Sequence, residues 1–303
     1  MKKNILNIAL LLSVLSLAAS CIRDDLEECP PMHLRIVVKD KNYFNVDKVD
    51  LENYKSEDLP FREYVPTLHY SITNLKTHET VVHSDLITVR GDEKEYNIDL
   101  PKSLPFGTYA IKVWGGMENL DPLEDDHTTI AFHPNNTQGS DVYLTCDTIE
   151  YSPSSHDDTI WLERTKGKLI IELVNLPAGF EYSRMTVHGL YKGVDSKFAY
   201  ADETYVQTDS HWTGDHAVTK TFLTPTTDDT PSYVNMVIHD GSLLDDKIRN
   251  NNTLNPNDVD LTMKRNELTV VRYVWDIEKR DFLIYVLVDD SWEQVHGMHI
   301  DYD

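Results

Sequence analysis

The sequence predicts an all-β protein, and three observations lead to this prediction. Apolar residues alternate with polar ones at period two in nearly every apolar cluster after residue 31, which is the pattern of half-buried strands. No apolar stripe with helical spacing continues for more than a turn or two. Stretches rich in turn-forming residues, such as "NLPAG", "LTPTTDDTPS" and "NNNTLNPND", separate the clusters.

The chain opens with a segment typical of a secretory signal peptide. Two lysines precede a mostly apolar run, and small residues at positions 18–20 suit a processing site. A membrane-spanning helix needs about 20 apolar residues, whereas this run ends earlier and meets Arg23, Asp24 and Asp25. We therefore expect residues 1–20 to be removed from the mature protein.

The letters "LAASC" at positions 17–21 resemble the lipobox of bacterial lipoproteins. The resemblance implies cleavage between Ser20 and Cys21 and the attachment of fatty acyl chains such as palmitate to Cys21, which would hold the protein to outer-membrane lipid. Two or three acyl chains bind a bilayer effectively permanently, whereas one chain binds it only marginally. The alternative is an ordinary signal peptide whose next residue is a cysteine.

Four acidic residues follow within the tether that we assign to 21–31, namely Asp24, Asp25, Glu27 and Glu28. They resemble the tract that directs surface lipoproteins of the Bacteroidetes through the outer membrane, which implies a lipid-anchored position facing the exterior. A solvated charged tether is the alternative, because exposed carboxylates would form one without any role in export.

The expected strands fall into two sets with uneven loops, which favours two β-sandwiches over one barrel. Removing 20 residues from 303 leaves 283, which is enough for two domains. The polar stretch "EYSPSSHDD" at 150–158 separates the sets, so the predicted domains are 32–155 and 156–303. The strands are expected at 34–38, 68–72, 96–100, 109–113 and 142–146, and then at 169–173, 185–187, 234–238, 259–263, 268–274 and 282–288.

Two cysteines, Cys29 and Cys146, remain once Cys21 is assigned to lipidation. A disulfide between them would tie the N-terminal segment to the end of the first domain, in a chain that leaves the reducing cytosol. Two free thiols are the alternative. Sequence spacing does not decide between them, because a bridge requires Cα atoms within about 7 Å of each other.

The charge of the chain argues against nucleic acid and anionic lipid headgroups as partners. The formal net charge is −23, and loss of the two leader lysines takes it to −25, since 26 basic residues then face 51 acidic ones. A chain with this balance repels both kinds of polyanion.

No local signature of a hydrolase, metalloprotease, nucleotide-binding enzyme or zinc module is present, so we predict no enzyme activity, no cofactor and no metal site. Acid-rich loops such as 119–127 lack the spacing of a defined calcium loop. Trp114, Trp161 and Trp275 are expected in the core or on a sheet face, whereas Trp212 is expected in a loop.

The order of residues after the leader is similar to the start of the FimB-type fimbrial anchor family of Bacteroidetes surface (type V) pili. The similarity comprises Cys21, the pair Asp25 and Leu26, the pair Cys29 and Pro30, and the immediate strand "HLRIVVK". Two later stretches also resemble that family, "RTKGKLIIELVNLP" at 164–177 and "LTVVRYVWDIEKRDFLIYVLVDDSW" at 268–292. The charged stretch "DKNYFNVDKVDLENYKSED" departs from it.

The resemblance implies two tandem transthyretin-like β-sandwich domains and an outer-membrane lipoprotein that anchors a cell-surface fimbria. It also implies a fimbrillin-like stalk subunit as partner, contacted by β-strand addition, in which an extended segment of one subunit fills a groove in another. An anchor must keep its first strand, because that strand is its covalent route to the lipid. We therefore expect Leu34 to Val38 to stay paired, so that the fibre ends at this protein.

The C-terminus offers a candidate donor strand for that contact, because Met298, Ile300 and Tyr302 alternate with polar residues. A last edge strand of the protein's own second domain is the alternative. Two other functions stay open. A surface glycan-binding lipoprotein predicts two or three exposed, coplanar aromatic rings. A stalk or tip adhesin of the same superfamily predicts proteolytic loss of the N-terminal strand or a long C-terminal extension.

Overall fold

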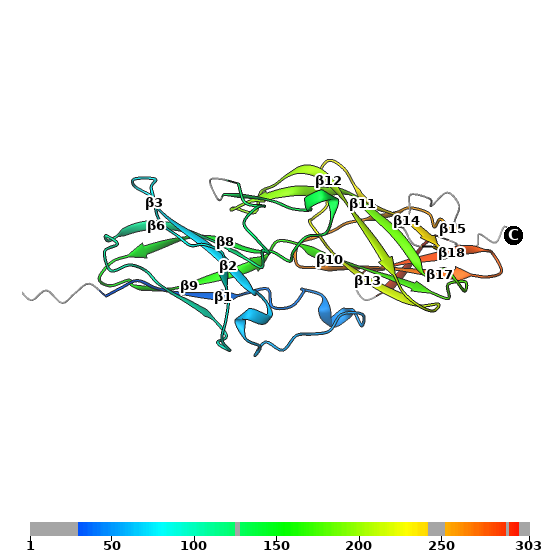
Figure 1. Ribbon diagram of the computed structural model, residues 1–303, viewed down its shortest axis with the longest axis horizontal. Coiled ribbons are helices and arrows are strands. Elements are labelled where there is room, and N and C mark those ends of the chain that lie inside the picture. Colours follow the sequence, from blue (N-terminus) through cyan, green and yellow to red (C-terminus); the bar gives the residue numbers. More distant parts are fainter. Residues whose placement is uncertain (1–29, 125–127, 242–251, 289–290, 297–303) are drawn as a thin grey trace, which may run out of the picture.

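The computed structural model describes residues 30–124, 128–241, 252–288 and 291–296. Strands dominate these residues, and the helices among them are three single 3₁₀ turns at Val46–Lys48 (η1), Phe61–Glu63 (η2) and Pro134–Asn136 (η3). The prediction of an all-β protein is confirmed. Three sheets form an elongated molecule, with the strands of the first half toward one end and those of the second half toward the other (Figure 1).

The first unit, residues 30–164, is built on one long sheet that bends back on itself. One stretch contains β5 (Tyr96–Asp99), β1 (His33–Val38) and β9 (Asp157–Arg164). The other contains β3 (Thr80–His83), β2 (Thr67–Asn74), β6 (Gly107–Gly115) and β8 (Tyr143–Tyr151), with the short β4 (Ile87–Thr88) paired to β2. The β8–β9 pairing joins the stretches. Side chains from both fill one core, including Leu34, Leu68, Ile111, Ile149 and Ile160.

The second unit, residues 165–296, contains two sheets around a second core. The five-stranded sheet has the order β13 (Ala217–Leu223), β10 (Gly167–Val174), β17 (Leu268–Asp276), β18 (Asp281–Val288) and β19 (Ser291–His296). The other sheet has the order β12 (Tyr200–His211), β11 (Tyr182–Asp195), β14 (Ser232–His239) and β15 (Thr253–Leu254), and β16 (Val259–Leu261) also pairs with β14. Side chains from both sheets meet between them, including Ile171, Val187, Val234, Tyr273 and Ile284.

The chain passes between the units at a different point from the sequence-based boundary after residue 155. Residues 157–164 form β9, which pairs with β1 and β8 in the first unit. Ser152 and Ser155 are bridged to each other, so the polar stretch is the turn of a β8–β9 hairpin. In addition, β7 (Thr129–Ala131) pairs with β11 of the second unit. Turn residues look alike in a hairpin and in a linker, which is why composition did not locate this join.

The join between the units contains two buried cations. The Arg164 guanidinium donates to Asp141 Oδ2 at 3.0 Å and to Asn266 Oδ1 at 2.7 Å. The Lys166 side chain is 1% exposed, and its Nζ donates to the carbonyl oxygens of Gln138 and Ser140 at 2.7 and 2.8 Å. Lys166, which directly precedes β10, therefore fixes the loop at 138–140 to the start of the second unit. Arg164 links Asp141 of the first unit to Asn266 of the second.

A segment that we call the strap, residues 41–52, connects the units a second time. Three of its apolar side chains form a buried cluster with residues of β10 and β17, namely Tyr43, Val46 and Val49 with Ile170, Leu268 and Val270. Glu52 forms ion pairs with Lys168 on β10 and Lys220 on β13, each at 3.0 Å. The strap therefore covers the outer side of β10, whose inner side faces the second core.

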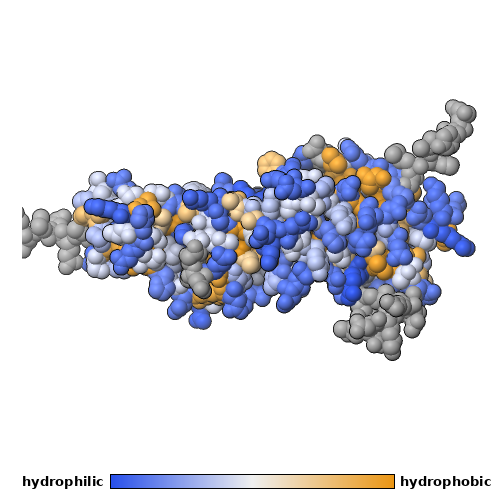
Figure 2. All heavy atoms as spheres, turned by 90° about the horizontal axis from the view of Figure 1, so that it is seen from above, coloured by the Kyte–Doolittle hydropathy of each residue, from blue (hydrophilic) through white to orange (hydrophobic). Residues whose placement is uncertain are grey.

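The outer surface combines hydrophilic regions with smaller apolar patches. The face in Figure 2 is mainly hydrophilic over both units, with smaller apolar patches between the polar regions. Between the units, a third apolar cluster joins strands of the first unit to β7 and β11, and it contains Trp114, Ile130, Phe132, Leu144 and Val194. Together with the strap and the buried cations, this cluster makes the two units one continuous body.

We predict that stability depends on pH through Lys166. Burial lowers the pKa of this ammonium to about 7. The unfolded chain keeps the proton up to about pH 10.4. Between these values the unfolded state binds more protons, so the free energy of unfolding rises with pH by at most about 1.4 kcal/mol per unit. Urea unfolding of the wild type and of Lys166→Met between pH 7 and about 9.5 measures this. We expect the free energy of unfolding of the wild type to rise with pH relative to that of Lys166→Met. A difference between the two proteins that stays constant with pH would contradict the prediction.

Candidate functional site

The first strand, β1, lies in the interior of its stretch of sheet, between β5 and β9. Figure 1 shows it beside β9. It pairs antiparallel with β5 from His33 to Ile36 and parallel with β9 along its whole length. Leu34 and Ile36 are 0% exposed and Val38 is 2% exposed, so every second side chain points into the first core. β-Branched and leucine residues at period two explain this placement, because one face of the strand is buried and the other is not.

Both ends of β1 are held by further main-chain hydrogen bonds. At its start, His33 N donates to His156 O at 2.8 Å, and Met32 O accepts from Leu100 N at 2.9 Å. At its end, Lys39 N donates to Leu162 O at 2.9 Å. The Tyr151 hydroxyl donates to Pro30 O at 2.9 Å, so the hydrogen bonds that fix this segment extend back to the first described residue. No position for another strand is left between β5 and β9.

The predicted leader and tether sites lie outside the described residues. These are the cleavage site at Ser20 and Cys21, the lipidation site Cys21, the acidic tract Asp24, Asp25, Glu27 and Glu28, and Cys29. They stay predictions. The described chain starts immediately after them at Pro30, three residues before β1 begins.

Cys146 is a free, half-buried thiol on β8, opposite Lys112 of β6. Five residues further along β8, Tyr151 holds the carbonyl of Pro30. Cys29 lies outside the described residues, so the disulfide between Cys29 and Cys146 stays a prediction.

The described chain ends in a strand that the sequence patterns did not predict. β19 pairs with β18 and is an edge strand of the five-stranded sheet. Its sequence "SWEQVH" does not alternate, because its two apolar residues, Trp292 and Val295, are three positions apart. Both side chains are partly exposed. The candidate donor residues Met298, Ile300 and Tyr302 come after it and lie outside the described residues.

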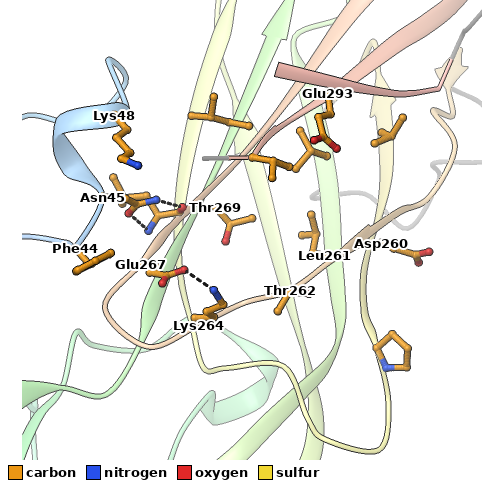
Figure 3. A pocket seen from close by; sticks show the side chains of 16 residues that line it. Phe44, Asn45, Lys48, Asp260, Leu261, Thr262, Lys264, Glu267, Thr269 and Glu293 are labelled. Carbon is orange, nitrogen blue, oxygen red and sulfur yellow. Dashed lines mark hydrogen bonds and ion pairs between the residues drawn. The ribbon is translucent and has the colours of Figure 1, made fainter. Parts of the chain in front are cut away.

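A groove of about 580 Å³ lies where β17 and β18 separate, and the strap forms one of its walls (Figure 3). The β17–β18 pairing starts only at Val271 and Val286, so the first residues of β17 have no partner in β18. The Asn45 side chain takes the place of a neighbouring strand at Leu268. Its Oδ1 accepts from Leu268 N at 2.8 Å, and its Nδ2 donates to Leu268 O at 2.9 Å.

The exposed apolar side chains around this groove come from both units. Phe44 of the strap is 81% exposed, and Val288 and Val295 are 41% and 49% exposed. The charged residues on its walls have both signs, with Lys48 and Lys264 on one hand and Asp260, Glu267 and Glu293 on the other. The groove therefore has no net preference for an anion or a cation.

Aromatic residues form two rows on the outer face of β12, β11 and β14. In one row Tyr182 stacks on His211 and on His239, with 4.4 Å and 5.5 Å between the ring centroids. In the other row His188 stacks on Tyr233, with 4.7 Å between the ring centroids. Rings at about the spacing of neighbouring strands, with their planes nearly parallel, cover each other's faces. These rows do not make the flat, open platform that a sugar ring would stack on.

The tryptophans lie close to where their patterns predicted. Trp114 is fully buried, and Trp275 packs against the second core. Trp161 lies on β9 with 51% of its surface exposed, so it is a sheet-face residue. Trp212 comes after β12 in a loop, as predicted, but its side chain also packs against the second core.

The described part of the chain carries neither a metal cluster nor a membrane-spanning helix. It holds no group of three or more histidine, cysteine, aspartate or glutamate side chains placed to bind a metal ion. None of its helices has the length and apolarity needed to cross a bilayer.

The strap, which forms one wall of the groove, is a segment whose packing the sequence patterns missed. Tyr43, Val46 and Val49 recur every third residue within a charged stretch, and this spacing was the available signal for a buried face. The residues that meet this face, Ile170, Leu268 and Val270, lie more than a hundred positions later, so their contact with the strap has no local signature.

No protein-family model matches the sequence, and no curated protein matches it. Solved structures from Bacteroides share its fold. A candidate adhesin from Bacteroides ovatus matches over 92% of this chain and 98% of its own, with a TM-score of 0.57 at 15% identity. A candidate adhesin from Bacteroides thetaiotaomicron matches over 90% of this chain and 100% of its own, with a TM-score of 0.55 at 11% identity.

A candidate polysaccharide-binding protein from Bacteroides thetaiotaomicron also matches, over 88% of this chain and 98% of its own, with a TM-score of 0.55 at 9% identity. The fimbrial anchor protein Mfa2 from Porphyromonas gingivalis gives a TM-score of 0.47 at 13% identity, which is too low for an inference to rest on. At these identities the likenesses establish the fold alone: the chain has the fold of these Bacteroides proteins.

We predict that β1 contributes to stability through its inward side chains. Ile36→Ala would remove buried methyl groups from the first core and lower the free energy of unfolding by about 2–5 kcal/mol. The matched control is Arg35→Ala on the exposed side of the same strand, with an expected change within about 0.5 kcal/mol. Urea unfolding of both variants measures the difference. Equal effects would contradict the burial of one face.

Proposed function

We propose that the protein is an outer-membrane lipoprotein that anchors a cell-surface fimbria and ends its assembly. In this proposal the leader is cleaved between Ser20 and Cys21, and the acylated Cys21 holds the chain to the membrane. Asp24, Asp25, Glu27 and Glu28 direct it to the exterior face. A fimbrillin-like stalk subunit is the partner, and the protein has no enzymatic role.

The position of β1 is the observation that carries this proposal. β1 has strand partners on both sides and gives three side chains to the first core. Strand addition between subunits requires an open place in a sheet, with main-chain groups and side-chain pockets free for the incoming segment. While β1 is present, the first unit has no such place between β5 and β9. A chain that is tethered through β1 would therefore end a fibre.

The two units support the proposal of tandem transthyretin-like domains. Each unit encloses its own apolar core between stretches of sheet, with the first core within residues 32–162 and the second within 169–284. The candidate adhesins with the same fold match over nearly their whole lengths, so both units belong to the shared architecture. We take that architecture as the frame of a surface structural protein.

We assign the stalk contact to the far end of the second unit. β19 is an edge strand, and such a strand presents unpaired main-chain groups on which another chain can add. The residues after it include Met298, Ile300 and Tyr302, the predicted donor strand. The edge strand and the predicted donor segment are therefore consecutive in the sequence.

The glycan-binding alternative required exposed, coplanar aromatic rings. In the two rows on the outer face of β12, β11 and β14, Tyr182 lies against His211 and His239. His188 lies against Tyr205 and Tyr233, so neighbouring rings cover both Tyr182 and His188. The adhesin alternative predicts proteolytic loss of the N-terminal strand or a long C-terminal extension. In the folded chain that strand is part of the first core, so its loss would expose buried side chains. These observations favour the anchor.

The decisive experiment is made in the producing bacterium. The mature protein is expected to begin at an acylated Cys21, as mass spectrometry of the purified protein would show. Cys21→Ala removes the acylation site, so fimbriae are expected in the culture medium instead of on the cells. A mature chain that begins after Arg35 or Arg62, or fimbriae that stay on cells carrying Cys21→Ala, would contradict the proposal.

A further inference from the structure

The directions of β1 and β9 are the starting point. The two strands are parallel, and six consecutive residues of β1, His33 to Val38, pair in register with Asp157 to Leu162. Both strands therefore begin at the tethered end of the first unit and point toward the second (Figure 1). The chain enters β1 from residue 30, and it leaves β9 after Arg164 to enter β10 of the second unit.

This arrangement determines how the first unit responds to tension along the molecule. A pull on the N-terminus draws β1 out by its start, and a pull on the second unit draws β9 forward by its end. The two strands are then displaced in opposite directions along their own axes. Because the hydrogen bonds between parallel strands run across those axes, all of them are loaded together and none can break first.

The side chains of β1 add to this resistance. Leu34, Ile36 and Val38 are buried in the first core, so sliding β1 along β9 would move all three out of their contacts together. β5 holds the other side of the strand over four residue pairs. A pull across the strands would instead separate the pairs one at a time, starting at His33 and Asp157.

The strap supplies a second path for the same tension, because it continues directly from the end of β1. Asn45 makes two hydrogen bonds to the main chain of Leu268, at 2.8 and 2.9 Å. Glu52 pairs with Lys168 and Lys220 at 3.0 Å, and the buried side chains of the strap pack on β10 and β17. The second unit is thus attached to β1 through the strap as well as through β9.

The ends of the two paths are also joined to each other. Arg164 N, at the end of β9, donates to Asp40 Oδ2 at 2.8 Å, immediately after β1. Lys39 Nζ pairs with Glu163 Oε1 at 3.0 Å across the same two strands. The connection onward is enclosed, since Thr165 and Lys166 are 0% and 1% exposed.

We propose that β1, β9 and the strap form a tension clamp, which carries pulling force from the second unit to the N-terminal tether by shearing parallel strands instead of peeling them apart. The inference rests on the proposed function for the source of the force, a fimbria held at the far end. The mechanical response itself belongs to the folded chain and is measured without fimbriae.

The test is single-molecule pulling of the chain from residue 22 to 303, with Cys29→Ser and Cys146→Ser so that handles attach only where intended. In the shear geometry the handles are at the two termini. In the peeling geometry one handle is at the N-terminus and the other at Asp157→Cys, beside the start of β1. The length of chain released identifies the unit that opens in each event.

The first unit is expected to open at a severalfold higher force in the shear geometry than in the peeling geometry at the same loading rate. Asn45→Ala combined with Glu52→Gln should lower the shear force and leave the peeling force unchanged. Asp50→Asn is the matched control, because it removes one negative charge from an exposed position in the strap, and no change is expected.

Similar opening forces in the two geometries would overturn the clamp. A shear force that the Asn45 and Glu52 substitutions leave unchanged would remove the strap from the load path. Failure of the anchor proposal looks different, since fimbriae that stay on cells carrying Cys21→Ala, or a mature chain cut after Arg35, would leave the pulling forces of the purified protein unaltered.

Discussion

The parallel pairing of β1 with β9 is the constraint on which the rest of the structure depends. The first strand of the unit lies against its last one, so the sheet is complete only when residues 33–164 have folded together. This contact brings the N-terminal tether and the exit to the second unit onto neighbouring strands. Removal of β1 would open the sheet between β5 and β9 and empty three positions of the first core. The strand that follows the proposed lipid tether is therefore also a structural necessity.

The same constraint explains why many hydrogen bonds and apolar contacts connect the two units. Arg164 ends β9 and is held by Asp141 and Asn266, and Lys166 starts the second unit within reach of two loop carbonyls. Burying a cation is costly unless hydrogen bonds or an ion pair offset the lost hydration. Asp141 and Asn266 supply this for Arg164, whereas burial lowers the pKa of Lys166 despite its two carbonyl partners. With the strap on the other side of β10, the two units meet through polar and apolar contacts that leave little freedom for hinge motion. A rigid connection suits a protein proposed to hold a fibre.

Every strand that the local patterns predicted is present, but β9, β12, β13 and β19 were not predicted, and neither were the connections. Alternation such as Leu34, Ile36 and Val38 has a direct physical cause, because one face of the strand is buried. The predicted boundary assigned residues 157–164 to the second half, because the turn before them has the composition of a linker, whereas β9 pairs with β1 and β8. Leu268 lies more than two hundred residues after Asn45, and Asn266 lies about a hundred residues after Arg164, so only the folded chain brings these partners together. For the leader and the donor segment the sequence remains the sole basis, because those residues lie outside the described structure.

The central claim is that β1 is a permanent strand and not a detachable one. Native-state hydrogen exchange of the β1 amides tests it most directly, because local detachment and global unfolding give different exchange free energies. We predict that the amides from Leu34 to Val38 exchange only through global unfolding, with the same protection as those of β6. Exchange of β1 at a much lower free energy, while β6 and β9 stay protected, would contradict the claim.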